Sequence, residues 1–138
     1  AQAKAIFSGE CDIVLMNTYY FALMKFNNKK PEQKKWAKAT DVIFYNQGGR
    51  GQHINVSGGA IAKYSKNNEE AIRFLEWMTQ PKAQKIYSAV NFEYPVNPKV
   101  KLGGKIMEWG TFKADNLSIS EIAKNSKKAQ MIIDKVGW

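Results

Sequence analysis

The sequence predicts an α/β fold, because short apolar runs typical of buried strands are interspersed with amphipathic helical segments. The strand-like runs are DIVLM, DVIFY and HINV, and each is followed at once by an Asn or Ser residue typical of turns. The helical segments carry apolar residues three and four positions apart and begin with residues that cap helices. With 138 residues, 44% of them hydrophobic, the chain is long enough for one domain with its own core.

The first part of the chain is predicted to pass from a helix through a strand into a second helix. The sequence starts as though inside a helix that ends in a turn at Ser8–Gly9, so we expect further residues before Ala1. Asp12–Met16 is predicted to be a strand buried on both faces. Asn17 and Thr18 are good N-caps for the following helix, whose apolar positions are Tyr20, Leu23, Met24 and Phe26.

The middle of the chain is predicted to hold two further strands. NNKKPEQKK, residues 27–35, is interpreted as a charged surface link interrupted by proline. Asp41–Tyr45 is the second predicted strand, and the glycine-rich stretch NQGGRG connects it to the third, His53–Val56, which ends at Ser57-Gly58-Gly59.

Three later helices are marked by their start signals. Asn67 and Asn68 precede two glutamates at the positive end of the helix dipole, Pro81 stands at the tolerated first turn of the next helix, and Ser118-x-x-Glu121 is a capping box. Between them, NFEYPVNPKV is kept extended by its prolines. The apolar faces predicted to be buried are Ala71, Leu75 and Met78; Ala83, Ile86, Tyr87 and Val90; and Ile122, Ala129, Ile132, Ile133 and Val136.

Composition narrows the function classes. The net charge is +9, from 21 Lys and Arg against 12 Asp and Glu, but the basic residues are scattered, which favours a solvated surface over a polyanion site. The single cysteine, Cys11, excludes an internal disulfide, and no Cys/His cluster indicates zinc. The sequence holds neither a signal peptide nor an apolar run of the roughly 18 residues that span a bilayer. Trp36, Trp77, Trp109 and Trp138 are interpreted as core or lobe-contact residues.

Tyr19 and Tyr20 are the candidate metal ligands. At the first turn of a helix two long phenols can converge beyond the backbone, where unpaired N–H groups favour the phenolate. A ferric ion prefers anionic oxygen, whereas zinc or copper would require the His and Cys residues that this chain nearly lacks. The alternative is that both rings are ordinary packing at a helix start.

Other chemical groups are weaker candidates. His53 in its strand is interpreted as structural, Arg50 as a solvated turn arginine, and Ser57-Gly58-Gly59 as a simple turn. Glu93 and Asp115 have no partner that the sequence can place. With one His, one Cys and no GxSxG, no nucleophilic triad can be assembled, so we expect no enzyme.

Five stretches together resemble one family: CDIVLMNTYY, RGQHINVSGGAIAKYSKNNEEAIRFLEWM, NFEYPVNP, WGTFKADNLSISEIA and DKVGW. They resemble the C-terminal half of the periplasmic ferric-iron-binding proteins, the substrate-binding components of bacterial iron(III) ABC importers. The likeness extends over nearly the whole chain, and NTYY and NFEYPVN are its most specific parts. By this resemblance, Tyr19 and Tyr20 match the paired tyrosine ligands of Fe3+, which in the family is often held with an added anion.

The resemblance implies a partial type II periplasmic-binding-protein fold that lacks the N-terminal half. Residues 1–48 would belong to the C-terminal lobe, residues 49–95 would cross to the other lobe, and residues 96–138 would return as closing helices. An ABC permease is the implied partner and the periplasm the implied location. Because the remaining ligands would lie in the absent half, we expect weak or no iron binding by this chain alone.

Three further expectations complete the prediction. Strands without their usual neighbours leave open edges, so we expect a homo-oligomer. A type II binding protein for another solute, such as a polyamine or an organic anion, is the main alternative function, and there the tyrosines would stack on the ligand. A basic nucleic-acid-binding domain is the other alternative, supported by the charge alone.

Overall fold

A computed structural model describes residues 2–137 and divides the chain into two compact units. The first unit comprises the residues up to Ile43 together with Asn55–Thr111. The second unit comprises Phe44–Ile54 and the residues from Phe112 onward. Each unit is therefore built from segments that are distant in the sequence.

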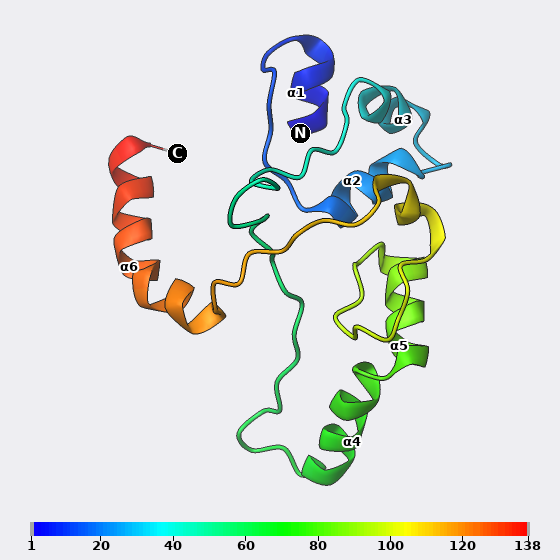
Figure 1. The fold of residues 1–138 in the computed structure, drawn as a ribbon, viewed down its shortest axis with the longest axis vertical. Helices are drawn as coiled ribbons and strands as arrows, with labels where there is room; N and C mark the ends of the chain where they lie inside the picture. Colours follow the sequence, from blue (N-terminus) through cyan, green and yellow to red (C-terminus); the bar gives the residue numbers. More distant parts are fainter. Residues whose placement is uncertain (1, 138) are drawn as a thin grey trace. The chain divides into compact units, whose positions relative to one another are not determined.

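Helices are the regular elements of both units (Figure 1). The second unit contains α6, Ile119–Val136. The first unit contains α1 Gln2–Ser8, α2 Thr18–Lys25, α3 Pro31–Lys38, α4 Asn68–Met78, α5 Pro81–Ile86, the π-helix η1 Tyr87–Asn91 and the 3₁₀-helix η2 Gly104–Trp109. None of the described helices combines the length and the apolarity that crossing a membrane requires.

The predicted helix starts are confirmed. Asn17 and Asn67 are the N-caps of α2 and α4, and Pro81 occupies the first turn of α5. At α6 the hydroxyl of Ser118 accepts a hydrogen bond from the backbone N–H of Glu121 at 3.2 Å, as the capping box requires. Gly137 ends this helix in the left-handed conformation, with φ 68°.

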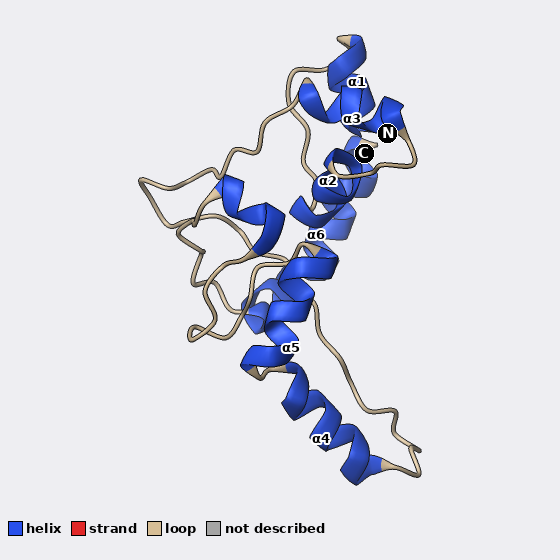
Figure 2. Ribbon diagram, turned by 90° about the vertical axis from the view of Figure 1, so that its right-hand side faces the viewer, coloured by secondary structure: helices blue, strands red, loops and turns tan. Residues whose placement is uncertain are grey.

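The three predicted strands, Asp12–Met16, Asp41–Tyr45 and His53–Val56, are not strands in the structure. Figure 2 draws no strand among the described residues, and the single ladder contact there is a parallel bridge between Gln52 and Ala114. The side chains of Ile13 and Ile43 are 83% and 82% exposed. A strand persists only where neighbouring backbone pairs with it, and the described residues supply no such neighbour. The strand half of the α/β prediction is therefore wrong for this chain.

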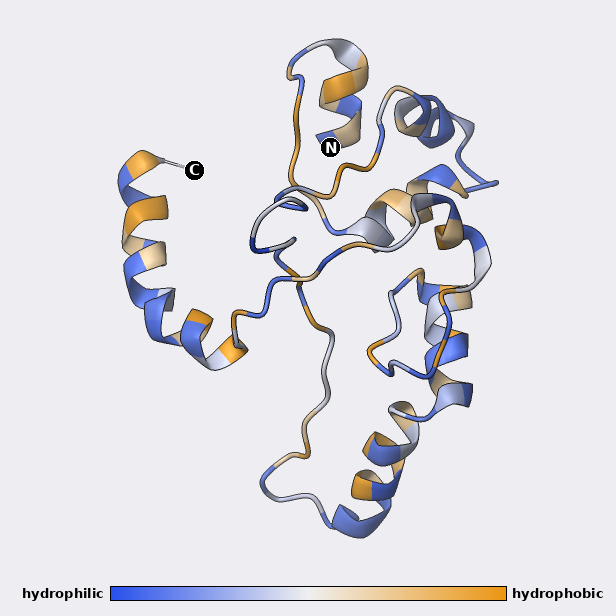
Figure 3. Ribbon diagram, viewed as in Figure 1, coloured by the Kyte–Doolittle hydropathy of each residue, from blue (hydrophilic) through white to orange (hydrophobic). Residues whose placement is uncertain are grey.

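The predicted burial of the helix faces is also largely wrong. No residue of α4 or α6 is buried, and Val136 is 66% exposed, although α6 carries its apolar residues at helical intervals (Figure 3). In α5, Ala83 is buried but Ile86 is exposed. Periodicity identifies the apolar face of a helix, but a second element must cover that face before it is buried.

The link predicted at residues 27–35 is wrong as well, because α3 begins inside it. Pro31 stands at the first turn, where its missing N–H costs no hydrogen bond. The residues that follow are good helix formers, and Ala37 is buried. The proline that suggested an interruption is the start of the helix.

Small residues let the first three helices pack closely. Ala3, Ala22 and Ala37 are buried, one on each of α1, α2 and α3. Beside them Phe21 packs against Trp109, with ring centroids 5.7 Å apart. Lys25 Nζ lies 2.7 Å from Glu108 Oε1. These contacts fix α2 against α3 and η2. Trp36 and Trp109 are half-buried and Trp77 is 42% exposed, whereas Trp138 lies outside the described residues.

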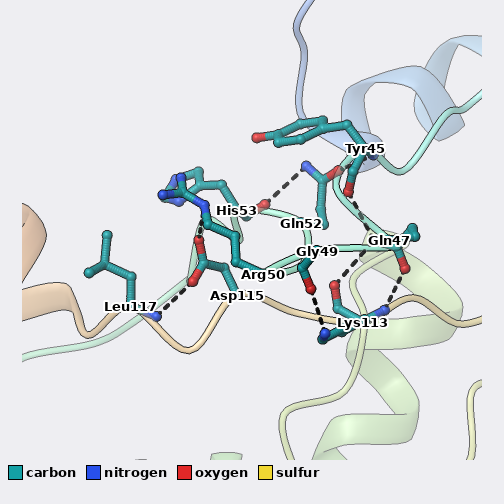
Figure 4. A network of polar contacts seen from close by, with 9 residues as sticks. All are labelled: Tyr45, Gln47, Gly49, Arg50, Gln52, His53, Lys113, Asp115 and Leu117. Carbon is teal, nitrogen blue, oxygen red and sulfur yellow. Dashed lines mark hydrogen bonds and ion pairs between the residues drawn. The ribbon is translucent and has the colours of Figure 1, made fainter.

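A polar network joins the two segments of the second unit (Figure 4). The backbone N–H of Gln52 donates to Lys113 O, and that of Asp115 donates to Gln52 O, both at 2.8 Å. Gly51 makes this approach possible, since its φ is +106° and an added Cβ would lie 2.7 Å from the backbone of Ala114.

Asp115, for which the sequence indicates no partner, forms an ion pair with Arg50. Arg50 Nε lies 2.9 Å from Asp115 Oδ2. The other carboxylate oxygen, Oδ1, accepts from the N–H of Leu117 at 3.0 Å. Arg50 lies in a turn, as predicted, and its side chain is 68% exposed, but it also forms an ion pair within the second unit.

Candidate functional site

Tyr19 and Tyr20 occupy the first turn of α2, as the sequence predicts. The backbone at Asn17 is extended, with φ −70° and ψ 137°, and the helix begins at the next residue. The N–H of Tyr20 donates to Asn17 O at 3.2 Å. Both phenols therefore stand at the end of the helix where backbone N–H groups lack intrahelical partners.

The two rings contact each other. Their centroids are 4.2 Å apart and their planes are tilted by 43°. Tyr20 is 55% exposed and Tyr19 is half-buried. The pair is not sunk in an apolar core, since neither side chain is buried.

Asn17 links Tyr19 to a second segment. Its amide nitrogen Nδ2 donates to the hydroxyl of Tyr19 at 3.4 Å. Its amide oxygen accepts from Asn55 Nδ2 at 3.3 Å. The segment that starts at Asn55 is thereby held beside the first turn of α2.

The pKa of the Tyr19 phenol is raised above its ordinary value of 10.0. The main cause is a hydrogen bond with the Tyr20 side chain, followed by desolvation, while the bond from Asn17 acts in the opposite direction. This direction is opposite to that expected from the helix N-terminus alone. Without a cation nearby, Tyr19 keeps its proton at neutral pH.

Each tyrosine lines its own hollow in the first unit. Tyr20 borders a hollow of about 1160 Å³, whose wall includes Leu15, Phe26 and Lys105. Tyr19 borders a smaller one of about 400 Å³, which is also lined by Leu23, Ser57, Val90, Asn91 and Glu93. Among the residues that line either hollow, Glu93 alone is acidic.

Glu93 is the site residue that sequence reasoning left unassigned. It is half-buried, and its negative charge is one of the causes that raise the pKa of Tyr19. The NFEYPVN motif contains it, but 74 positions separate it from Tyr19, so no spacing in the sequence connects the two.

The remaining candidates do not join this pair. His53 and Arg50 belong to the second unit, and the His53 side chain is exposed. Cys11 is a free thiol of intermediate exposure. Within residues 2–137 no three His, Cys, Asp or Glu side chains gather in a way that could hold a metal ion. The candidate site therefore consists of the two phenols, with the carboxylate of Glu93 in the hollow beside Tyr19.

Comparison with known proteins points to solute binding. The model of the family described as bacterial extracellular solute-binding protein matches residues 1–85. The chain is 38% identical over its whole length to a Synechocystis protein named Iron uptake protein A1 and covers 38% of that protein.

Solved structures of similar sequence have the same fold over this region. A ferric binding protein from Campylobacter jejuni is 43% identical, with a TM-score of 0.87. A Trichodesmium protein solved in complex with iron and citrate is 42% identical, with a TM-score of 0.91. In both cases the alignment covers 99% of this chain and 43% of the solved chain. The chain thus spans about two fifths of the length of the relatives it matches.

Proposed function

Because the chain belongs to the bacterial extracellular solute-binding protein family, we propose that it is part of the ferric-iron-binding component of an ABC import system. The iron-related names of its relatives support iron as the cargo. The task is capture and delivery in the periplasm to an ABC permease, with no chemical turnover.

Tyr19 and Tyr20 are the proposed ligands of the ferric ion. The observation that carries this assignment is the contact between two accessible phenol rings at the start of α2. A trivalent cation displaces the phenolic protons, just as bound metals deprotonate other ligands, and gains two anionic oxygens. Asn17 holds the Tyr19 hydroxyl in place by its hydrogen bond.

Two phenolates fill only part of the octahedral shell of the ion. Other parts of a longer, two-lobed type II protein would supply further ligands, and an anion such as citrate would complete the shell. In that protein, residues 1–48 and 96–138 are assigned to the C-terminal lobe and residues 49–95 to the crossing segment. The chain alone is expected to bind iron weakly, with water or an added anion at the remaining positions.

Titration with ferric citrate to millimolar concentration tests the ligands. We expect a visible phenolate-to-iron charge-transfer band for the unmodified chain and none for the Tyr19→Phe/Tyr20→Phe variant. Tyr45→Phe/Tyr64→Phe is the matched control and should keep the band, because both of these rings are exposed and neither lines a hollow of the pair. Equal absorbance of the unmodified chain and the Tyr19/Tyr20 variant would remove the assignment. A polyamine or organic-anion cargo stacked on the rings would give no such colour.

Association of the chain with itself is a second part of the proposal. The segments that contain Ile13 and Ile43 expose apolar side chains, and no backbone ladder engages these segments within residues 2–137. Two copies that pair along these segments would bury that surface and add backbone hydrogen bonds between the copies. The isolated chain is therefore proposed to be a homo-oligomer.

A further inference from the structure

Glu93 is a half-buried carboxylate without a positive partner. No hydrogen bond or ion pair engages its side chain among the described residues, although the chain carries a net charge of +9. A carboxylate removed from water normally acquires a donor or a cation. Within the described residues the charge of Glu93 is therefore uncompensated, and it lies in the wall of the hollow that Tyr19 also lines.

The backbone around Glu93 is held in an uncommon conformation. The π-helix η1 ends at Asn91, and Phe92 follows in the left-handed region with φ 59° and ψ 35°. A bulky residue rarely adopts this conformation, and such strain occurs preferentially at functional sites. The Phe92 ring packs on Phe26 with centroids 5.6 Å apart, which helps to hold the reversal.

Two hydrogen bonds anchor the chain after the reversal. The hydroxyl of Tyr94 donates to Gly110 O at 3.0 Å. The N–H of Val96 donates to the side chain of Gln84 at 2.8 Å, and Gln84 itself is buried. Glu93 is thus fixed in the wall of the 400 Å³ hollow that it shares with Tyr19, Ser57 and Asn91.

Charge balance indicates what this carboxylate does. Two phenolates contribute two negative charges, which neutralise a divalent cation completely but leave a ferric ion with one positive charge. With the negative charge of Glu93 added, a site that holds a trivalent cation has no net charge. The same site with a divalent cation keeps one uncompensated negative charge. Coulomb attraction to a fixed charge also grows in proportion to the charge of the cation.

We propose that Glu93 is a specificity-determining residue, whose carboxylate makes the hollow beside Tyr19 select trivalent over divalent metal ions. This inference rests on the proposed role of Tyr19 and Tyr20 in iron binding. The carboxylate also stabilises the protonated form of the phenols. A ferric ion carries three positive charges and displaces two protons, so the carboxylate still favours the bound ion by one net charge.

Calorimetric titration with ferric citrate and with Mn2+ tests the proposal. For Glu93→Gln we expect the affinity for iron to fall about a hundredfold and that for Mn2+ to change little, because the two displaced protons cancel both charges of the divalent ion and leave one net charge of the trivalent ion. Glu93→Asp, which keeps the charge, should retain the trivalent preference. Glu70→Gln is the matched control, since this exposed residue of α4 lines neither hollow.

The possible outcomes separate this proposal from the one on which it rests. The role of Glu93 would be overturned if Glu93→Gln lowered the affinity for both metals equally, or if it bound both metals as Glu70→Gln does. The tyrosine-dependent iron colour would persist in either case. Absence of that colour in the unmodified chain would overturn the tyrosine site, and the role of Glu93 with it.

Discussion

Ferric iron should bind this chain more tightly as the pH rises, by up to about a hundredfold for each pH unit near neutrality. The pKa of Tyr19 is raised, so this phenol still carries its proton throughout that range. Each phenol must lose its proton to become a ligand, and two released protons make the logarithm of the affinity rise by two per unit of pH. Higher pH removes the competing protons, so the slope is positive.

Competition titrations against a fixed concentration of citrate at several pH values measure this slope. The Tyr19→Phe variant has one phenol left and should show about half the slope, since one proton is released instead of two. The Tyr19→Phe/Tyr20→Phe variant gives the baseline due to citrate and iron hydrolysis alone. An unmodified chain with the slope of that baseline would show that phenols are not the ligands.

Replacing two exposed isoleucines should convert the chain from an oligomer into a monomer. Ile13 and Ile43 are 83% and 82% exposed in segments without a described ladder. Lysine at both positions puts like charges along the edges through which two copies would pair, a device that natural sheet edges use against association. Size-exclusion chromatography with light scattering at high protein concentration reads the result directly.

Val96→Lys controls for the added charge. Val96 is also exposed, at 65%, but follows Pro95 in the turn-rich segment after Glu93. This variant should remain an oligomer like the unmodified chain. A well-folded monomer without any substitution would contradict the proposed association, and so would an Ile13→Lys/Ile43→Lys variant that stays oligomeric.

The helix termini could be predicted from the sequence because they depend on neighbouring residues. The bond from Glu121 to Ser118, the Pro81 start and the Gly137 end each involve a side chain and a backbone within one turn. The α-helix α3, which was missed, has the same local origin, since Pro31 is its first residue.

Strands and burial could not be predicted because they depend on distant partners. The DIVLM and DVIFY runs have strand composition, but a strand also needs a neighbouring backbone, and none pairs with them within the described residues. The apolar face of α6 is equally clear in the sequence and equally uncovered. The composition of these segments shows which side chains are suited to burial. Whether those side chains are buried depends on a second element that packs against them.

The part of the candidate site that depends on neighbouring residues could be predicted, and the part that depends on distant residues could not. Tyr19 and Tyr20 are adjacent in sequence, so their convergence at a helix start could be inferred. The bond between Asn17 and Asn55, and the approach of Glu93 to Tyr19, require chain reversals that no short motif specifies. The direction of the pKa shift of Tyr19 was missed because it depends mainly on the hydrogen bond between the two side chains.

The location of iron in a crystal of this chain soaked in ferric citrate tests the central claim most directly. Anomalous scattering at the iron absorption edge identifies the metal independently of its ligands. We expect one iron peak within bonding distance of both Tyr19 Oη and Tyr20 Oη. A peak bonded to one of these oxygens alone, or an iron held elsewhere on the chain, would contradict the paired-phenolate site.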